Sequence, residues 1–410
     1  SLMYVYVDDY SDSNIDLSLC TSKINDNTTV TGCNIRSACA TCVQRMAISI
    51  IDECVVVLPT NTSSVITVDT ITYGSIGINN AIYNGSISLL GNNNTLQSLG
   101  SSERLLDIHV IDGATRGRFI IHIQDVIIVG FGSEGIIGGA IYINNTFGTT
   151  LENVQFKHNI ALNGGALYVE STNGFILNHC IFYNNTAIST SGGMHHENFN
   201  VDMVINNTIF YANIAKRSGG AMGSYDSYNL LIINSIFIDN WCRLYGGGIY
   251  FLDNNFYTTI SNTKFINNYA GNFGGGLRFR SYNENFMIIG CLFSRNYSPY
   301  GGGVYIKHYN IQMIYKSCIF EYNRAIDGGA MYMDSYNPNL LLTNNTFIYN
   351  HATNNGGVMS IYSYNDVTDI TNCQFLHNNA VNGGAIYTDY NNFFWNMQYC
   401  VFRNNTATDR

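Results

Sequence analysis

The sharpest break in the sequence pattern is Met194-His195-His196-Glu197, where two histidines stand beside a carboxylate. Histidine is the commonest metal ligand and transfers protons near neutral pH. The run reads as a strand, and neighbouring side chains on a strand point to opposite faces. His195 and His196 therefore cannot easily bind one metal ion, and we expect a tolerated irregularity with no metal and no catalytic residue.

Four charged residues, Arg278, Arg280, Lys307 and Asp334, lie at nearby positions of successive repeats. Such a line could bind an acidic polysaccharide, but it is more often a solvated face with weak ion pairs. A β-helix lyase or hydrolase would need clustered carboxylates, or an acidic calcium site beside a basic residue. We find no such cluster in adjacent repeats, and no nucleophile elbow, P-loop or dinucleotide motif. We predict that the chain is not an enzyme and takes no cofactor.

The cysteines fall into two groups. The N-terminal group has irregular spacing in a polar region, which suggests disulfide bonds and secretion; it comprises Cys20, Cys33, Cys39, Cys42 and Cys54. Zinc is the weaker alternative, because Cys39-x-x-Cys42 has no convincing second pair. The later group is expected to be buried small side chains; it comprises Cys180, Cys242, Cys291, Cys318, Cys373 and Cys400. Disulfides joining Cys291 to Cys318 and Cys373 to Cys400 are the alternative there.

Ten sequons are candidates for N-glycosylation: Asn27, Asn61, Asn84, Asn93, Asn144, Asn184, Asn206, Asn296, Asn344 and Asn404. Many sequons arise by chance in a chain rich in Asn and Thr, so we expect about half to be used. Asn296 is the weakest candidate, because it belongs to the repeat described next and Pro299 follows its sequon. Together with the cysteines, the sequons favour a eukaryotic secretory route and a place outside the cell.

The elements that carry these residues form a repeat of about 27 residues. Ten phenylalanines, from Phe156 to Phe402, each precede an asparagine by three positions. These asparagines are Asn159, Asn185, Asn213, Asn240, Asn268, Asn296, Asn323, Asn350, Asn378 and Asn405. A Gly-Gly pair follows each of the first nine phenylalanines. The short β-branched and aromatic segments between these turns read as strands.

Stacking such coils pairs each strand in parallel with its copy one coil away, about 4.8 Å apart. Phe then fills the interior, and the Asn column can bond amide to amide and to turn backbone. Six tyrosines after the Gly-Gly pairs have the opposite parity, so we expect them to face outward; they are Tyr142, Tyr168, Tyr250, Tyr305, Tyr332 and Tyr387. Such rings can stack on sugars or a partner, or simply on one another.

The Gly-Gly-Ala-Ile and Phe-x-x-Asn motifs resemble the repeats of polymorphic outer-membrane proteins, a group of autotransporter adhesins. More broadly, the chain is similar to pectin-lyase-like right-handed parallel β-helices, well over 110–410 and loosely over 1–110. The resemblance implies that fold, and a surface, adhesive or structural role shared with some polysaccharide-active enzymes. We predict an all-β right-handed solenoid with regular repeats at 111–410 and a Cys-rich cap with irregular first coils at 1–110. The cap is expected to include a short helix from Ala38 to Ile51, with Ser37 as its N-cap.

Composition narrows the function. Only 11% of residues are charged and the net charge is −9, which argues against nucleic-acid binding. No apolar run is long enough to span a membrane. The sequence stops within a repeat, so that end either continues or stacks on the next subunit and builds a filament. We predict an extracellular, glycosylated structural protein, a fibre subunit assembling end to end. The alternative is a polysaccharide-binding adhesin, lyase or hydrolase of β-helix fold.

Overall fold

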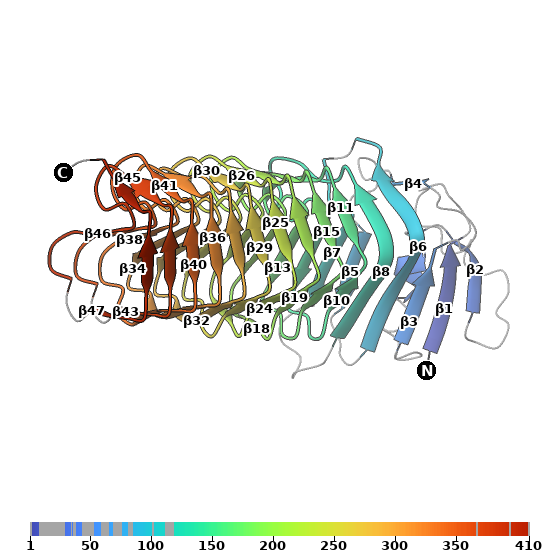
Figure 1. The fold of residues 1–410 in the computed structure, drawn as a ribbon. Coiled ribbons are helices and arrows are strands. Elements are labelled where there is room, and N and C mark those ends of the chain that lie inside the picture. Colours follow the sequence, from blue (N-terminus) through green and yellow to red (C-terminus); the bar gives the residue numbers. More distant parts are fainter. Residues whose placement is uncertain are drawn as a thin grey trace.

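The chain forms one long stack of parallel coils, seen from the side in Figure 1. The computed structural model describes residues 2–7, 29–33, 35, 38–42, 53–58, 65–68, 76–80, 85–100, 102–110, 119–365, 368–392 and 395–408. The stack is a parallel β-solenoid of about 11 turns with about 28 residues per turn, and it has almost no helix. The predicted fold class is confirmed, with a period close to the expected one. Within the described residues, no helix is both long and apolar enough to cross a membrane.

Sheet B runs along one face and contains twelve strands. They are β5 (Ile76–Asn80), β7 (Leu106–Val110), β9 (Ile141–Asn144), β13 (Leu167–Glu170), β17 (Met194–Glu197), β22 (Met222–Ser224), β27 (Ile249–Asp253), β31 (Leu277–Ser281), β34 (Val304–His308), β38 (Met331–Met333), β42 (Met359–Ile361) and β46 (Ile386–Thr388).

Sheet A covers the other two long faces with two strand columns that join at its N-terminal strands. Its first column is β10 (Thr150–Glu152), β14 (Ile176–Asn178), β19 (Val204–Asn206), β24 (Leu231–Ile233), β28 (Thr259–Ser261), β32 (Glu284–Ile289), β35 (Ile311–Lys316), β39 (Leu340–Thr343), β43 (Thr368–Thr371) and β47 (Trp395–Gln398). Its second column, which carries the repeat phenylalanines, is β11 (Gln155–Lys157), β15 (Ile181–Tyr183), β20 (Ile209–Tyr211), β25 (Ile236–Ile238), β29 (Lys264–Ile266), β33 (Leu292–Ser294), β36 (Ile319–Glu321), β40 (Thr346–Ile348), β44 (Gln374–Leu376) and β48 (Val401–Arg403). The N-terminal strands are β1 (Leu2–Val7), β2 (Thr29–Cys33), β3 (Glu53–Val57), β4 (Val65–Val68), β6 (Gly85–Ser98) and β8 (Phe119–Val129).

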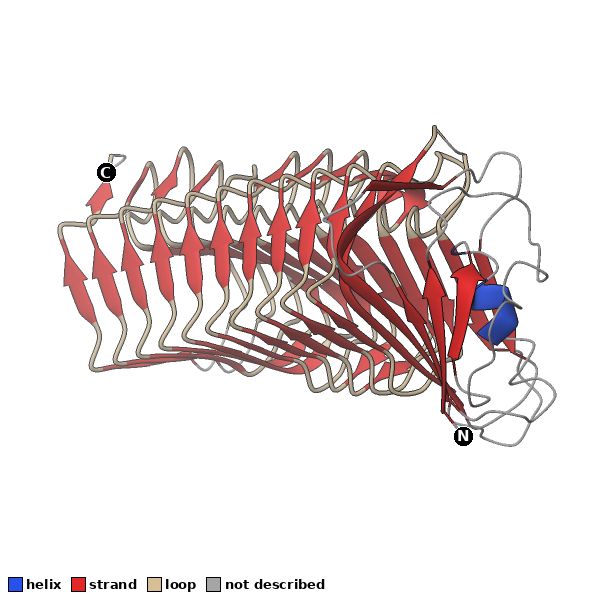
Figure 2. Ribbon diagram, turned by 90° about the vertical axis from the view of Figure 1, so that its right-hand side faces the viewer, coloured by secondary structure: helices blue, strands red, loops and turns tan. Residues whose placement is uncertain are grey.

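Short strands fill the corners of the coils. Those after the repeat asparagines are β12 (Ile160–Asn163), β16 (Thr186–Thr190), β21 (Ile214–Ala215), β26 (Trp241–Cys242), β30 (Tyr269–Ala270), β37 (Arg324–Ala325), β41 (His351–Ala352), β45 (Asn379–Ala380) and β49 (Thr406–Ala407). At another corner lie β18 (Asn200–Val201) and β23 (Ser227–Tyr228). Figure 2 shows how closely each coil repeats the path of its neighbour.

The phenylalanine column explains why so short a strand is stable. In β15 and its copies, a buried Phe stands between two partly exposed residues. Consecutive rings are nearly parallel, for example Phe210 on Phe237 with centroids 4.7 Å apart. Offset stacking adds to the burial of each ring. Register is therefore set by like residues lying on like residues along the axis.

The asparagine column forms a buried ladder. In its middle, the Asn268 backbone N–H and Nδ2 both donate to Oδ1 of Asn296, at 3.0 Å each. Nδ2 also donates to the carbonyl of Phe237 in the preceding coil, at 2.9 Å. Successive members repeat this pattern 26 to 28 residues apart. The ladder thus satisfies turn backbone groups that would otherwise be buried without partners.

The Gly-Gly pairs have two separate steric causes. The first glycine adopts a left-handed conformation, as at Gly246 with φ 67°. The second packs against the next coil, since a Cβ on Gly247 would lie 2.4 Å from the carbonyl oxygen of Gly275. Backbone cannot move aside as a side chain can. Glycine at both positions is what lets neighbouring coils approach to strand-pairing distance.

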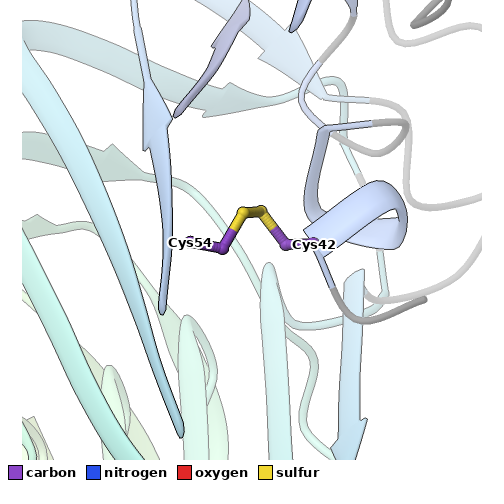
Figure 3. The surroundings of a disulfide bond; sticks show 2 residues. All are labelled: Cys42 and Cys54. Carbon is purple, nitrogen blue, oxygen red and sulfur yellow. A yellow bond between two sulfur atoms is a disulfide. The ribbon is translucent and has the colours of Figure 1, made fainter. Parts of the chain in front are cut away.

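The described residues at the N-terminal end include a short helical segment within the range of the predicted helix, Ala38 to Ile51. Helical residues lie at Ile35 and 38–42, whereas Ser37 and 43–52 fall outside the described residues. Cys42 and Cys54 form a disulfide with a Cα–Cα distance of 5.7 Å (Figure 3), which ties this segment to β3. Cys39 is buried in the same apolar core. Cys20 lies outside the described residues, and Cys33 is placed by its backbone in β2.

Candidate functional site

The outward face of sheet B holds many of the candidate residues from the sequence: the tyrosine column, His195 and the charged residues. Its strands pair in register, so that Tyr142, Tyr168 and His195 are successive partners across β9, β13 and β17. Further along, Tyr250, Arg278 and Tyr305 continue the same outward column. A second outward column lies two residues beyond each of these positions. It holds Glu170, Glu197, Arg280 and Lys307.

The tyrosine column lies on the outward side of the strands as expected, but three of its members are covered. Tyr168, Tyr250 and Tyr305 point away from the main core but are only 3%, 6% and 3% exposed. Aromatic side chains from the preceding corner fold over two of them. Tyr245 lies 6.0 Å from the Tyr250 ring, and Phe273 lies 4.6 Å from the Tyr305 ring. The rings therefore form a second packed layer, which parity alone cannot reveal.

A pair of carboxylates occupies the N-terminal half of this face. Glu170 and Glu197 are register partners on adjacent strands. Glu170 accepts hydrogen bonds from Tyr142 at 2.8 Å and from Asn198 at 2.7 Å. The sequence-based expectation of no carboxylate cluster in adjacent coils is corrected here. Glu170 and Glu197 are 27 residues apart, which is one repeat. This spacing is the feature of the sequence that could have revealed the pair.

His195 links Glu197 to a buried serine. Ser191 Oγ lies 2.8 Å from His195 Nδ1, and His195 Nε2 lies 3.2 Å from Glu197 Oε2. Tyr168 donates to the other oxygen of Glu197. The hydrogen bond from His195, followed by that from Tyr168, lowers the pKa of Glu197 although burial opposes this. Burial and the neighbouring carboxylates raise the pKa of Tyr142 and Tyr168, so both phenols remain donors.

The order Ser191–His195–Glu197 matches the connectivity of a hydrolytic triad. Ser191, however, is fully buried, and its Oγ occupies the space that a Cβ on Gly223 would need. Because a substrate cannot reach the buried Ser191 hydroxyl, Ser191 cannot act as a nucleophile. We interpret the chain as a positioning network for Glu197. Among the described residues, no group of three or more His, Cys, Asp and Glu could hold a metal ion.

The two histidines face opposite sides of the strand, as the sequence predicted. His196 points into the solenoid and is fully buried, with Nδ1 2.8 Å from Ser227 Oγ. Burial, followed by the nearby His195, lowers the pKa of His196 to about 3. His196 is thus a neutral core residue near pH 7. The predicted charged line of Arg278, Arg280, Lys307 and Asp334 lies further along sheet B, on β31, on β34 and just after β38.

An open groove lies on the first column of sheet A, away from these residues. Its volume is about 580 Å³, and a smaller hollow of about 200 Å³ adjoins it through the shared residues Asn229 and Thr259. The wall consists of residues with left-handed backbone at or near the strand starts: Asn229, Tyr257, Asn285, Gln312 and Asn339. The floor is the outward column of the strands, including Met287, Ile314 and Leu341. The groove therefore runs along the solenoid axis from coil to coil.

The groove lining combines amides with apolar surface. Asn229, Gln312 and Asn339 are exposed. Tyr257 is 50% exposed and Met287 is 41% exposed. The charged residues that line the two hollows are Asp202 and Asp369, and neither hollow has a lysine or arginine in its lining. Amides both donate and accept hydrogen bonds, and aromatic or aliphatic groups cover the apolar face of a sugar ring. Sequence reasoning missed this groove, because no motif marks it.

The sequons differ in access. Asn93, Asn344 and Asn404 are exposed, whereas Asn144, Asn184 and Asn206 are partly buried. Asn296 is fully buried in the ladder, where Nδ2 donates to Asn323 Oδ1 and to the Phe265 carbonyl. A glycan on that nitrogen is incompatible with the folded ladder, which removes Asn296 from the candidates. Asn27, Asn61 and Asn84 lie outside the described residues.

No family model matches the chain, and no curated protein matches it. Among solved structures, it is similar to tailspike protein 3 of bacteriophage CBA120, with a TM-score of 0.51, 12% identity, and coverage of 97% of this chain and 61% of the tailspike. It is also similar to the A-module of the mannuronan C-5 epimerase AlgE6 of Azotobacter vinelandii (TM-score 0.41, 13% identity, 90% and 94% covered). A third similar structure is the surface protein and adhesin PfbA of Streptococcus pneumoniae (TM-score 0.38, 12% identity, 90% and 95% covered).

These comparisons correct one prediction. The prediction that the chain is not an enzyme is corrected: the β-helix fold is compatible with enzymatic activity. At such low identities the likeness extends to the fold alone. The chain is a right-handed parallel β-helix.

Proposed function

We propose that this chain is a surface or secreted β-helix protein that binds a neutral polysaccharide in the groove on sheet A. The observation that carries the proposal is the groove itself, with a wall of side-chain amides and Tyr257 above a floor of Met287, Ile314 and Leu341. Its acidic rim residues would repel an anionic chain. Its axial course suits a linear polymer, since the wall residues recur at about the 4.8 Å spacing of the coils.

The test compares two tyrosines in the same backbone setting. Tyr257 and Tyr282 both have left-handed backbone and are 50% and 58% exposed, but only Tyr257 lines the groove. Affinity electrophoresis through gels that contain neutral plant, fungal or bacterial polysaccharides would identify a ligand. Tyr257→Ala should then weaken binding about tenfold, which is 1.4 kcal/mol, and Tyr282→Ala should leave it unchanged. Equal effects of the two variants, or no retardation by any neutral polysaccharide, would refute the proposal.

Three finer features remain proposals. N-glycosylation at exposed sequons would coat a surface with few charges, and the disulfide between Cys42 and Cys54 fits an oxidising compartment.

End-to-end assembly into a fibre is supported by the parallel coil geometry, whose interfaces repeat along one axis. Electron microscopy of native protein would show filaments if the chain assembles and single rods if it does not. Membership of the pectin-lyase-like group, with repeats of the polymorphic outer-membrane type, rests on the motifs.

A further inference from the structure

A cluster of three cations lies on the outward face of sheet B, on a different sheet from the groove. Arg278 and Arg280 extend from β31, and Lys307 extends from the adjacent strand β34. Arg278 pairs in register with Tyr305, which places Arg280 beside Lys307 on neighbouring strands. Like charges placed side by side on adjacent strands destabilise a sheet. A negative charge beside these three cations would reduce the repulsion between them.

Arg278 is the unusual member of the cluster. Its side chain is only 4% exposed, and its guanidinium carbon lies 4.0 Å from the centre of the Tyr245 ring and 4.9 Å from that of Tyr250. Nε and Nη1 are buried and have no hydrogen-bond partner among the described residues. Aromatic faces stabilise the charge, but they accept no conventional hydrogen bond. Two N–H groups of a fixed cation are thus left without an acceptor.

The nearby carboxylates neutralise only one of the three cations by a direct ion pair. Arg280 Nη1 pairs with Asp253 Oδ2 at 3.1 Å. Asp334 Oδ2 instead accepts the Tyr305 hydroxyl at 2.9 Å, and its Oδ1 accepts the Ser335 backbone N–H. Burial, followed by the charges of Arg278 and Arg280, lowers the pKa of Lys307. Within the described part of the chain, Arg278 and Lys307 have no ion pair.

We propose that Arg278, Arg280 and Lys307 form a second binding site, which takes the carboxylate or sulfate groups of an anionic polysaccharide. Arg280 and Lys307 reach the anion from the open side. The caged Arg278 holds a fixed positive charge beneath it. Because the whole chain carries a net charge of −9, bulk charge opposes a polyanion and only a local cluster can retain it. The site goes beyond the proposed neutral-glycan groove and does not depend on it.

The experiment measures binding of polygalacturonate, dextran sulfate and unmodified dextran to the full chain at low salt. The double variant R280Q/K307Q leaves the buried Arg278 cage in place. It should weaken binding of at least one polyanion tenfold or more. The matched control is K264Q/R324Q, which removes the same charge from two exposed residues of other strands and should change the affinity less than twofold.

The two kinds of anion separate the two sources of ligand: polygalacturonate supplies only carboxylates, and dextran sulfate supplies sulfates. Absence of polyanion binding by the wild-type chain would overturn the proposal, and so would equal losses in the two double variants. Tyr257→Ala should leave polyanion binding intact. A loss there would show one shared site and also refute this inference. If neutral polysaccharides fail to bind while polygalacturonate binds, the groove proposal alone is lost.

Discussion

Individual residues in this solenoid take their properties from the face on which the coil places them. His195 and His196 are adjacent, yet one lies in an outward hydrogen-bonded chain with Glu197 and the other is sealed in the core. Charging His196 would leave an ion in an apolar interior, and this is why its pKa falls to about 3. The folded state thus holds His196 neutral at a pH where an unfolded chain would protonate it.

This difference predicts acid sensitivity with a definite sign. The folded pKa of His196 lies below the unfolded value of about 6.5. The unfolded chain therefore binds the extra proton between about pH 6.5 and pH 3, and stability falls as the pH falls through that window. From pH 7 to pH 4 this residue should cost about 3 kcal/mol of the free energy of unfolding.

Urea unfolding at several pH values tests the prediction. His196→Asn retains an acceptor for Ser227 and removes the titrating group, so its acid loss should be smaller than that of the wild type by about that amount. His158→Asn is the matched control, because His158 is exposed and already has a left-handed backbone that Asn accepts. An unchanged pH dependence in His196→Asn would show that other groups dominate the acid loss.

At the scale of the element, the stability of each coil depends more on side-chain ladders at its corners than on the length of its strands. Strands of three residues contribute few backbone hydrogen bonds, and the Asn ladder supplies the missing partners inside the corner. A second ladder, which the sequence analysis did not identify, serves another corner: Asn255 Nδ2 donates to Asn283 Oδ1, and Asn283 Nδ2 donates to Asn310 Oδ1. It continues through Asn337 and Asn365. These two corners are thus held by amides stacked along the axis.

Asn268→Ala should therefore destabilise the protein strongly for so small a change. Removing Oδ1 takes the acceptor from the backbone N–H and Nδ2 of Asn240, and removing Nδ2 takes a donor from the Phe237 carbonyl. Buried groups without partners cost about 1–3 kcal/mol each, so we expect a loss of about 2–4 kcal/mol in the free energy of unfolding. The exposed Asn379→Ala is the control and should cost under about 0.5 kcal/mol. Similar effects of the two variants would contradict the structural role of the ladder.

At the scale of the whole molecule, the solenoid separates its faces. Sheet B carries the charged outward columns, the first column of sheet A carries the groove, and the corners carry exposed tyrosines. Tyr282, Tyr309, Tyr336 and Tyr364 form one stacked row, with ring centres 5.0 to 5.5 Å apart. None of the exposed sequons Asn93, Asn344 and Asn404 lines the groove.

Expression of the chain through a eukaryotic secretory pathway tests this arrangement. Glycopeptide mass spectrometry should find glycans on Asn93, Asn344 and Asn404, whose side chains are exposed. Asn296 should be unmodified in the folded protein, since its amide is fully buried in the ladder. Asn296→Gln should therefore leave the glycan mass unchanged, whereas Asn344→Gln should remove one glycan. Occupancy at Asn296 in folded protein would contradict the ladder geometry.

The sequence by itself determined the period, the phenylalanine and asparagine columns and the opposite orientations of His195 and His196. These follow from local spacing, because a solenoid places each repeat on its own copy. The tertiary structure alone decided which outward residues are covered, as with Tyr250 beneath Tyr245 and Arg278 within its aromatic cage. It also assembled the groove from residues of several types on successive coils. Such features depend on how corners fold over neighbouring strands, and this packing has no signature in the spacing of the residues that take part.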